Sequence, residues 1–175
     1  MARLVAELGG GDRRSIGKSN AVVRSVLADP RLLTEIMDGL SSDDRLVRMR
    51  CADVAEKVSA QIPGCLRPHA AVLMVLAESA AEPELRWHLA QMLPRLGLDA
   101  RKRRTAASLL FRYLRDDSHI VQTCALQALV ELAQGDAPLL GKVRPIVDQL
   151  SRGRTGALAA RARKLRALLR KRQAG

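Results

Sequence analysis

The chain has 175 residues, of which 47% are hydrophobic, 27% are charged and only 2% are aromatic. This length suits about one domain with a real core, and the mixture of apolar and charged residues excludes a disordered chain. No apolar run approaches the roughly 18 residues needed to cross a bilayer, so the sequence predicts no membrane span. The N-terminal stretch contains Glu7 and no cleavage pattern, so we expect no signal peptide and a cytoplasmic protein.

The net charge of +12 is unevenly distributed. No Asp or Glu follows Asp148, whereas nine Lys and Arg residues do, which gives this tail +9 and the rest of the chain +3. Arginine far outnumbers lysine. Bidentate contacts with phosphate would explain this excess, but we attribute most of it to a GC-rich coding genome. The three cysteines, Cys51, Cys65 and Cys124, form no CxxC pair, so we expect reduced thiols and no zinc site.

Turn and capping signals divide the chain into helical hairpins. Residues 1–19 are rich in glycine and charge and are expected to form a leader ahead of a single domain over 20–175. Breaks are expected at Asp29-Pro30, Pro63-Gly64, Gly97 and Gly135-Asp136, where Pro and Gly interrupt apolar periodicity. The expected hairpins cover about residues 20–40, 42–79, 80–116 and 117–152, and a last helix covers 155–172.

The apolar face of the first helix in three hairpins repeats along the chain. Each face has apolar or small residues at i, i+4, i+7, i+8 and i+11, and the three sets lie 38 and then 36 residues apart. A period of roughly 20–50 residues is typical of solenoids, whose units stack because none can bury its apolar face alone. The sets are Val47, Cys51, Val54, Ala55 and Val58; Leu85, Leu89, Met92, Leu93 and Leu96; and Val121, Ala125, Ala128, Leu129 and Leu132.

Three segments carry the family resemblance: DRLVRMRCADVAEKV (44–58), PELRWHLAQMLPRL (83–96) and SHIVQTCALQALVEL (118–132). Each begins with an acidic residue, Ser or Pro, followed by Val-Arg, Leu-Arg or Val-Gln and an aliphatic pattern. The signatures of tetratricopeptide and ankyrin repeats are missing. The pattern resembles HEAT repeats over about residues 20–172, in particular small stand-alone bacterial HEAT-repeat proteins with no assigned activity.

The resemblance implies an all-α, right-handed α-α superhelix of about four hairpins with a C-terminal capping helix. It also implies that the second helix of each hairpin lines a concave surface. The sequence departs from the family in two ways. The units are shorter than the roughly 40 or more residues of HEAT repeats, and Gln122 stands where the other two segments have Arg48 and Arg86.

A polar stripe marks the second helices of the last two hairpins. At 100° per residue, one side of the helix over 99–116 collects cations and small polar residues, and the next hairpin continues the stripe. We predict a partner-binding surface there, although any amphipathic helix needs a solvated face, and that alternative stays open. The predicted surface comprises Arg101, Arg104, Arg112, Arg115, Lys142, Gln149 and Arg152.

The last helix has Leu158, Ala162 and Leu165 on its apolar side and cations on the other. A terminal cap with one polar face explains this pattern, and so does contact with nucleic acid or an acidic protein. We therefore predict a non-enzymatic scaffold or adaptor that binds a protein partner on a concave basic surface. The alternative is sequence-nonspecific binding of nucleic-acid phosphates through the Arg-rich C-terminal half.

We expect no enzymatic activity, cofactor, metal or small-molecule substrate. None of the histidines His69, His88 and His119 is followed four residues later by a carboxylate or another histidine. HEAT-like DNA glycosylases use aromatic residues and an acid in a basic groove, and the polar stripe offers no such cluster. The segment from Asp12 to Ser19 (DRRSIGKS) matches the end of a phosphate-binding loop, but Asp12 replaces its first glycine, so we expect no nucleotide site.

Overall fold

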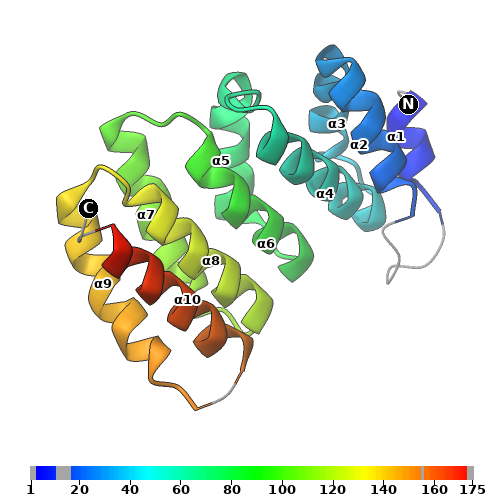
Figure 1. Ribbon diagram of the computed structural model, residues 1–175. Helices are drawn as coiled ribbons and strands as arrows, with labels where there is room; N and C mark the ends of the chain where they lie inside the picture. Colours follow the sequence, from blue (N-terminus) through cyan, green and yellow to red (C-terminus); the bar gives the residue numbers. More distant parts are fainter. Residues whose placement is uncertain (1–2, 11–16, 155, 173–175) are drawn as a thin grey trace. The chain divides into compact units, whose positions relative to one another are not determined.

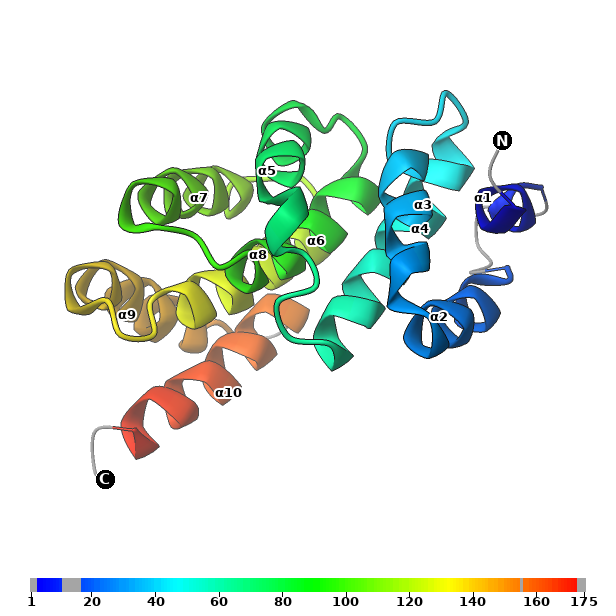
Figure 2. The same cartoon turned by 90° about the horizontal axis from the view of Figure 1, so that it is seen from above.

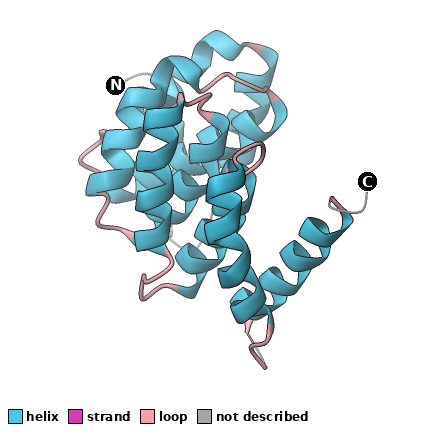
Figure 3. Ribbon diagram, turned by 90° about the vertical axis from the view of Figure 1, so that its left-hand side faces the viewer, coloured by secondary structure: helices cyan, strands magenta, loops and turns pink. Residues whose placement is uncertain are grey.

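The computed structural model describes residues 3–10, 17–154 and 156–172, and these residues form only helices and loops (Figure 1, Figure 3). The prediction of an all-α protein is confirmed. The chain forms two compact units, Met1–Gly97 (unit 1) and Leu98–Gly175 (unit 2). The boundary lies at Gly97, which the sequence places inside its third hairpin. No helix in the described part of the chain is long and apolar enough to span a membrane.

Unit 1 is built around the long helix α4, which packs against α1, α2, α3 and α6. All five α4 residues of the predicted repeat set, Val47 to Val58, are at most 2% exposed, and Leu89 of α6 is fully buried. The described helices of unit 1 are α1 (Arg3–Leu8), α2 (Ser19–Ala28), α3 (Leu33–Gly39), α4 (Arg45–Gln61), α5 (Ala70–Ser79) and α6 (Pro83–Met92), with short 3-10 turns at Pro30–Leu32, Arg67–His69 and Leu93–Arg95.

Close packing in unit 1 depends on a small residue where α3 meets α4. A Cβ atom added to Gly39 would clash with the sulfur of Cys51 and crowd the side chain of Val5, so a larger residue fits only if these neighbours shift. Burial raises the pKa of the Cys51 thiol to about 12, and the charge of Glu35 adds to this shift. Cys51 is therefore a reduced, inert core residue, as expected.

Helix α1 belongs to the core of unit 1, although it lies within the predicted leader. Leu4, Val5 and Leu8 are buried, and α1 packs against α3 and α4. A carboxylate oxygen of Glu35 accepts hydrogen bonds from the backbone N–H groups of Leu4 and Val5. At the other end of α1, the guanidinium of Arg50 donates to the carbonyl oxygens of Leu8 and Gly10, at 2.7 and 2.6 Å. Side chains from later helices therefore bind the free backbone groups at both ends of α1.

One polar position of the repeat has the same role three times. Arg48, Arg86 and Gln122 each donate to the carbonyl oxygen six residues earlier, at 2.6, 3.3 and 2.6 Å. The accepting carbonyls lie in the loop before each helix, so the side chain holds the loop against the helix that follows. Gln122 makes the same contact with an amide group that the two arginines make with a guanidinium. The substitution at this repeat position therefore preserves the contact.

Unit 2 comprises α7 (Ala100–Tyr113), α8 (His119–Leu132), α9 (Ala137–Ser151) and α10 (Ala157–Lys171). Helix α8 packs against the other three, and the five α8 residues of the repeat set are at most 6% exposed. Helix α10 lies along α8 and α9 in Figure 1 and buries Ala159, Ala162, Leu165 and Leu169. Asp99, Ser118 and Asp136 cap the first three helices with their side-chain oxygens.

Candidate partner-binding surface

The positive charge of the protein is concentrated in unit 2. This unit contains 17 Lys and Arg residues against 6 Asp and Glu residues, a net charge of +11. Unit 1 contains 13 against 12, a net charge of +1. Unit 2 therefore contributes most of the net positive charge that attracts anions.

The predicted polar stripe on α7 is confirmed. Asp99 begins the helix by accepting a hydrogen bond from the N–H of Lys102 at 2.8 Å, which is the main cause of the lowered pKa of Asp99. Ala106, Leu110 and Tyr113 are buried on the inner side of α7. The opposite side is exposed and carries Arg101, Arg104, Thr105, Ser108 and Arg112, with Arg115 exposed just after the helix.

Two of the predicted residues line the same groove. The groove lies between α7 and the first turns of α9, has a volume of about 300 Å³, and includes Arg104 and Lys142 in its lining. Figure 2, in which α7 and α9 are seen almost end-on, shows the two helices beside each other. We call this feature the α7–α9 groove. The remaining predicted residues are exposed on or next to the same helices but are not part of its lining: Arg101, Arg112, Arg115, Gln149 and Arg152.

The α7–α9 groove combines an apolar floor with two available cations. Its apolar lining comes from Ala107 and Phe111 of α7 and Leu139 of α9. Within the described residues, the side chains of Arg104 and Lys142 have neither a hydrogen bond nor an ion pair. The one acid in the lining, Asp136, already accepts a hydrogen bond from the N–H of Leu139 at 3.0 Å, as the cap of α9. The groove can therefore hold a carboxylate or phosphate together with an apolar group.

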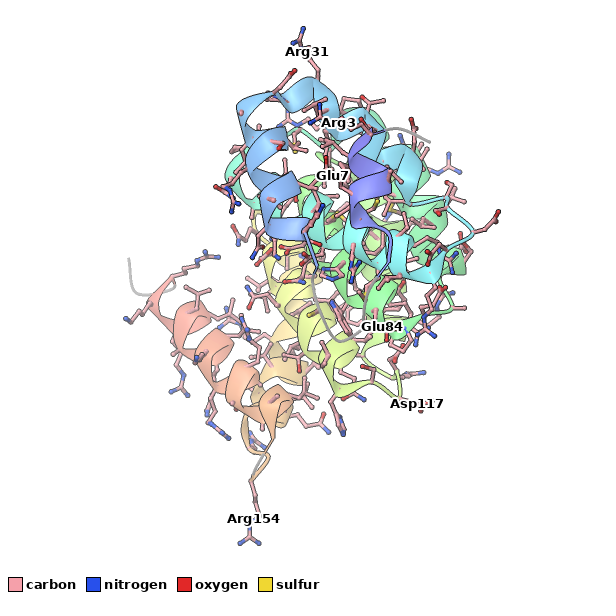
Figure 4. The ribbon with its side chains drawn as sticks, turned by 90° about the vertical axis from the view of Figure 1, so that its right-hand side faces the viewer. Arg3, Glu7, Arg31, Glu84, Asp117 and Arg154 are labelled. Atoms are coloured by element: carbon pink, nitrogen blue, oxygen red, sulfur yellow. The ribbon has the colours of Figure 1, made fainter. Side chains whose placement is uncertain are left out.

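Helix α10 divides its cations between intramolecular contacts and solvent. Arg161 donates to the side chain of Gln127 at 3.1 Å, Arg163 donates to the carbonyl of Gly153 at 2.9 Å, and Arg166 pairs with Asp148 at 2.9 Å. These contacts fasten α10 to α8, α9 and the loop between α9 and α10. Other cations of this end of the chain are exposed and have no such contact among the described residues: Arg154, Lys164, Arg170, Lys171 and Arg172. Figure 4 shows Arg154 projecting from the loop that precedes α10.

Unit 1 contains a buried histidine that the local sequence pattern did not indicate. His88 of α6 is 9% exposed, and its Nδ1 atom has no hydrogen-bond partner. Burial lowers the pKa of His88, although the charges of Asp53 and Glu56 on α4 act in the opposite direction. Asp53 itself pairs with Lys57 at 2.7 Å. Since these acids lie more than 30 residues before His88 in the sequence, no helical spacing links them to it.

The sequence predicts neither a metal site nor a nucleotide site, and the structure describes the residues concerned to different extents. The described residues include no group of three or more His, Cys, Asp and Glu side chains placed to hold a metal ion. The segment that resembles a phosphate-binding loop lies mostly at residues 12–16, outside the described residues. Of its end, Lys18 is exposed, whereas the hydroxyl of Ser19 is fully buried at the start of α2.

Comparisons of the chain with protein-family models, curated proteins and solved structures gave no match. The resemblance to HEAT repeats therefore depends on the residues of this chain alone.

Proposed function

We propose that the protein is a non-enzymatic binding module, a scaffold or adaptor, that holds an acidic segment of a protein partner in the α7–α9 groove. One observation carries this proposal. Arg104 and Lys142 come from two different helices, line one groove with an apolar floor, and have no partner among the described residues. Cations that are not neutralised within the chain can pair with carboxylates of a partner, while the floor takes an apolar side chain.

The apolar floor favours a protein segment over nucleic acid. A phosphate backbone would use Arg104 and Lys142 but would leave Ala107 and Leu139 without an apolar partner. Stacking of bases needs exposed aromatic faces, and Phe111 is the one aromatic residue in the lining of the groove. An acidic peptide with apolar side chains complements both parts of the lining.

Binding of nucleic-acid phosphates through the C-terminal half is the second candidate. The observation in its favour is the set of exposed cations on α10, Lys164, Arg170 and Lys171, which have no partner among the described residues. Such cations would neutralise phosphates and release counterions without reading sequence. This candidate uses a different helix from the α7–α9 groove, so mutations can separate the two.

The HEAT-like architecture is part of the proposal. Its support is the repeat period of 38 and 36 residues together with the loop contact shared by Arg48, Arg86 and Gln122. In this architecture the hairpins stack as a right-handed superhelix, α10 caps the last one, and the second helices present a concave surface. A cytoplasmic location, inferred from the sequence, belongs to the same proposal.

The experiment uses two charge-reversal variants that remove equal charge. Arg104→Glu with Lys142→Glu alters the α7–α9 groove, and Arg170→Glu with Lys171→Glu alters α10. Each variant is titrated against a fluorescent peptide of alternating glutamate and leucine and against duplex DNA, at two salt concentrations. Circular dichroism checks that both variants keep their helicity, which we expect because all four side chains are exposed.

We expect the groove variant to bind the peptide at least about tenfold more weakly, because each charge-assisted contact contributes roughly 1.5–3 kcal/mol. The α10 variant should keep most of its peptide affinity. The nucleic-acid alternative predicts that the α10 variant loses DNA binding, with a smaller salt dependence. Equal losses of peptide affinity in both variants would reject the groove as a site.

A further inference from the structure

A second cavity in unit 2 lies on the opposite face of α9. Leu140 and Arg144 line it, and at 100° per residue they face away from Leu139 and Lys142 of the α7–α9 groove. The cavity has a volume of about 350 Å³, and its lining comes from the end of α8, from α9 and from the end of α10. We call it the α8–α10 pocket.

Apolar side chains form most of the lining of this pocket. Val130 of α8, Ala133 just after α8 and Leu169 of α10 line it and are buried, and Leu140 of α9 is half-buried. An apolar chain placed here would lose water contact on one side and gain packing contacts on the other. The volume is at the lower end of the roughly 300–1,000 Å³ of small-molecule sites, so the pocket suits a small ligand.

The lining also contains Gln134, Gly135 and two arginines. Arg144 is half-buried on α9, and Arg172 lies at the C-terminal end of α10. Within the described residues, neither guanidinium has an ion pair or a hydrogen bond. The lining contains no acidic side chain. A half-buried guanidinium beside apolar groups and without a partner is stabilised by an anion, and the exposed guanidinium of Arg172 adds a second positive charge to the same pocket.

The geometry points to a binding site for a small amphipathic carboxylate in the α8–α10 pocket. The apolar chain lies against Val130, Leu140 and Leu169, and the carboxylate pairs with Arg144 and Arg172. A carboxylate suits the forked donors of a guanidinium. Because the head group loses part of its hydration next to an apolar base, a single charge costs less to bind than the double charge of a phosphate.

This site is independent of the proposed partner surface. It shares helix α9 with the α7–α9 groove but none of the lining residues. The protein could bind a carboxylate here whether or not an acidic segment binds the groove, and either finding can fail without the other.

The test is a titration of the full chain with sodium octanoate, followed by NMR of backbone amides. Gly135 lines the pocket and provides a local reporter. Butyrate tests the contribution of the apolar chain, and octylammonium tests the sign of the charge. The variant Arg144→Gln with Arg172→Gln removes both charges of the pocket, and Arg104→Gln with Lys142→Gln is the matched control in the α7–α9 groove.

We expect saturable shifts at Gly135 with octanoate, weaker binding of butyrate, and no binding of octylammonium. The pocket variant should bind octanoate about tenfold more weakly, since it loses two charge-assisted contacts, and the groove control should bind as the wild type does. Binding of octylammonium as strong as that of octanoate would overturn the proposal. So would shifts that persist unchanged in the pocket variant, or the absence of saturable shifts in the wild type.

Discussion

Unit 1 and unit 2 contain 13 and 17 basic residues, but the groups that surround these cations differ between the two units. In unit 1 several arginines contact acids and carbonyls of the same unit: Arg45 pairs with Glu84 at 2.7 Å, and Arg95 pairs with Glu56 at 3.0 Å. Arg48 likewise pairs with Glu82, which lowers the pKa of that carboxyl. In unit 2 the cations of the α7–α9 groove have no such partners among the described residues. The comparison shows that a high content of Lys and Arg indicates a binding surface only where the cations are not already paired with acids of the same unit.

The largest expected effect concerns the cores, in which the two units should behave alike. Leu89 of unit 1 and Leu129 of unit 2 are both fully buried. Replacing either with Ala removes packed methyl groups and leaves a cavity, at a cost of roughly 2–5 kcal/mol in the free energy of unfolding. Urea denaturation followed by circular dichroism measures this cost. An unchanged midpoint for either variant would show that its repeat register is wrong.

The second prediction contrasts one arginine from each unit. Arg50 is 2% exposed and donates to two carbonyl oxygens at the end of α1, whereas Arg104 is exposed in the α7–α9 groove. We expect Arg50→Met to lower the free energy of unfolding by about 2–3 kcal/mol, because it leaves the carbonyls without their charged donor. Arg104→Met should change it by less than about 0.5 kcal/mol. If denaturation experiments gave the same decrease in the free energy of unfolding for both variants, the distinction between arginines that hold the fold and arginines that are exposed for binding would be wrong.

A smaller effect is expected from the pH dependence of unit 1. Because burial lowers the pKa of His88 below the ordinary value of 6.5, the folded chain binds fewer protons there than the unfolded chain. Above about pH 6.5 His88 is neutral in both states and does not reduce the free energy of unfolding. As the pH falls from 6.5 towards the folded pKa, the unfolded chain binds a proton that the folded chain does not, and the free energy of unfolding decreases. The loss is at most about 1.4 kcal/mol per pH unit. His88→Gln should make stability fall less steeply below pH 6.5, and an identical slope in both proteins would contradict the assignment.

The helices could be predicted from the sequence because their signals are local. Capping residues such as Asp44 and Asp136, and breaks such as Gly97, act within one turn, and the predicted ends agree closely with those of the structure. The polar stripe of α7 was predictable for the same reason, since it depends only on helical periodicity.

The remaining features depend on contacts between residues distant in the sequence. The meeting of Arg104 and Lys142 in one groove depends on how α7 and α9 pack, which periodicity does not specify. The contact of Arg50 with the end of α1 joins residues about 40 positions apart. A single sequence carries no local signal for such pairs, and a buried arginine runs against the usual preference of charged residues for the surface.

The most direct test of the partner surface compares equal charge reversals in the two units. Lys18→Glu with Arg24→Glu in unit 1 matches Arg104→Glu with Lys142→Glu in unit 2, since each pair contains one exposed lysine and one exposed arginine. The dissociation constant of the fluorescent acidic peptide is measured for both variants and the wild type by anisotropy. We predict a loss of at least about tenfold for the unit 2 variant and less than about threefold for the unit 1 variant. Losses of the same size in both would contradict a built site and leave only an attraction to net positive charge.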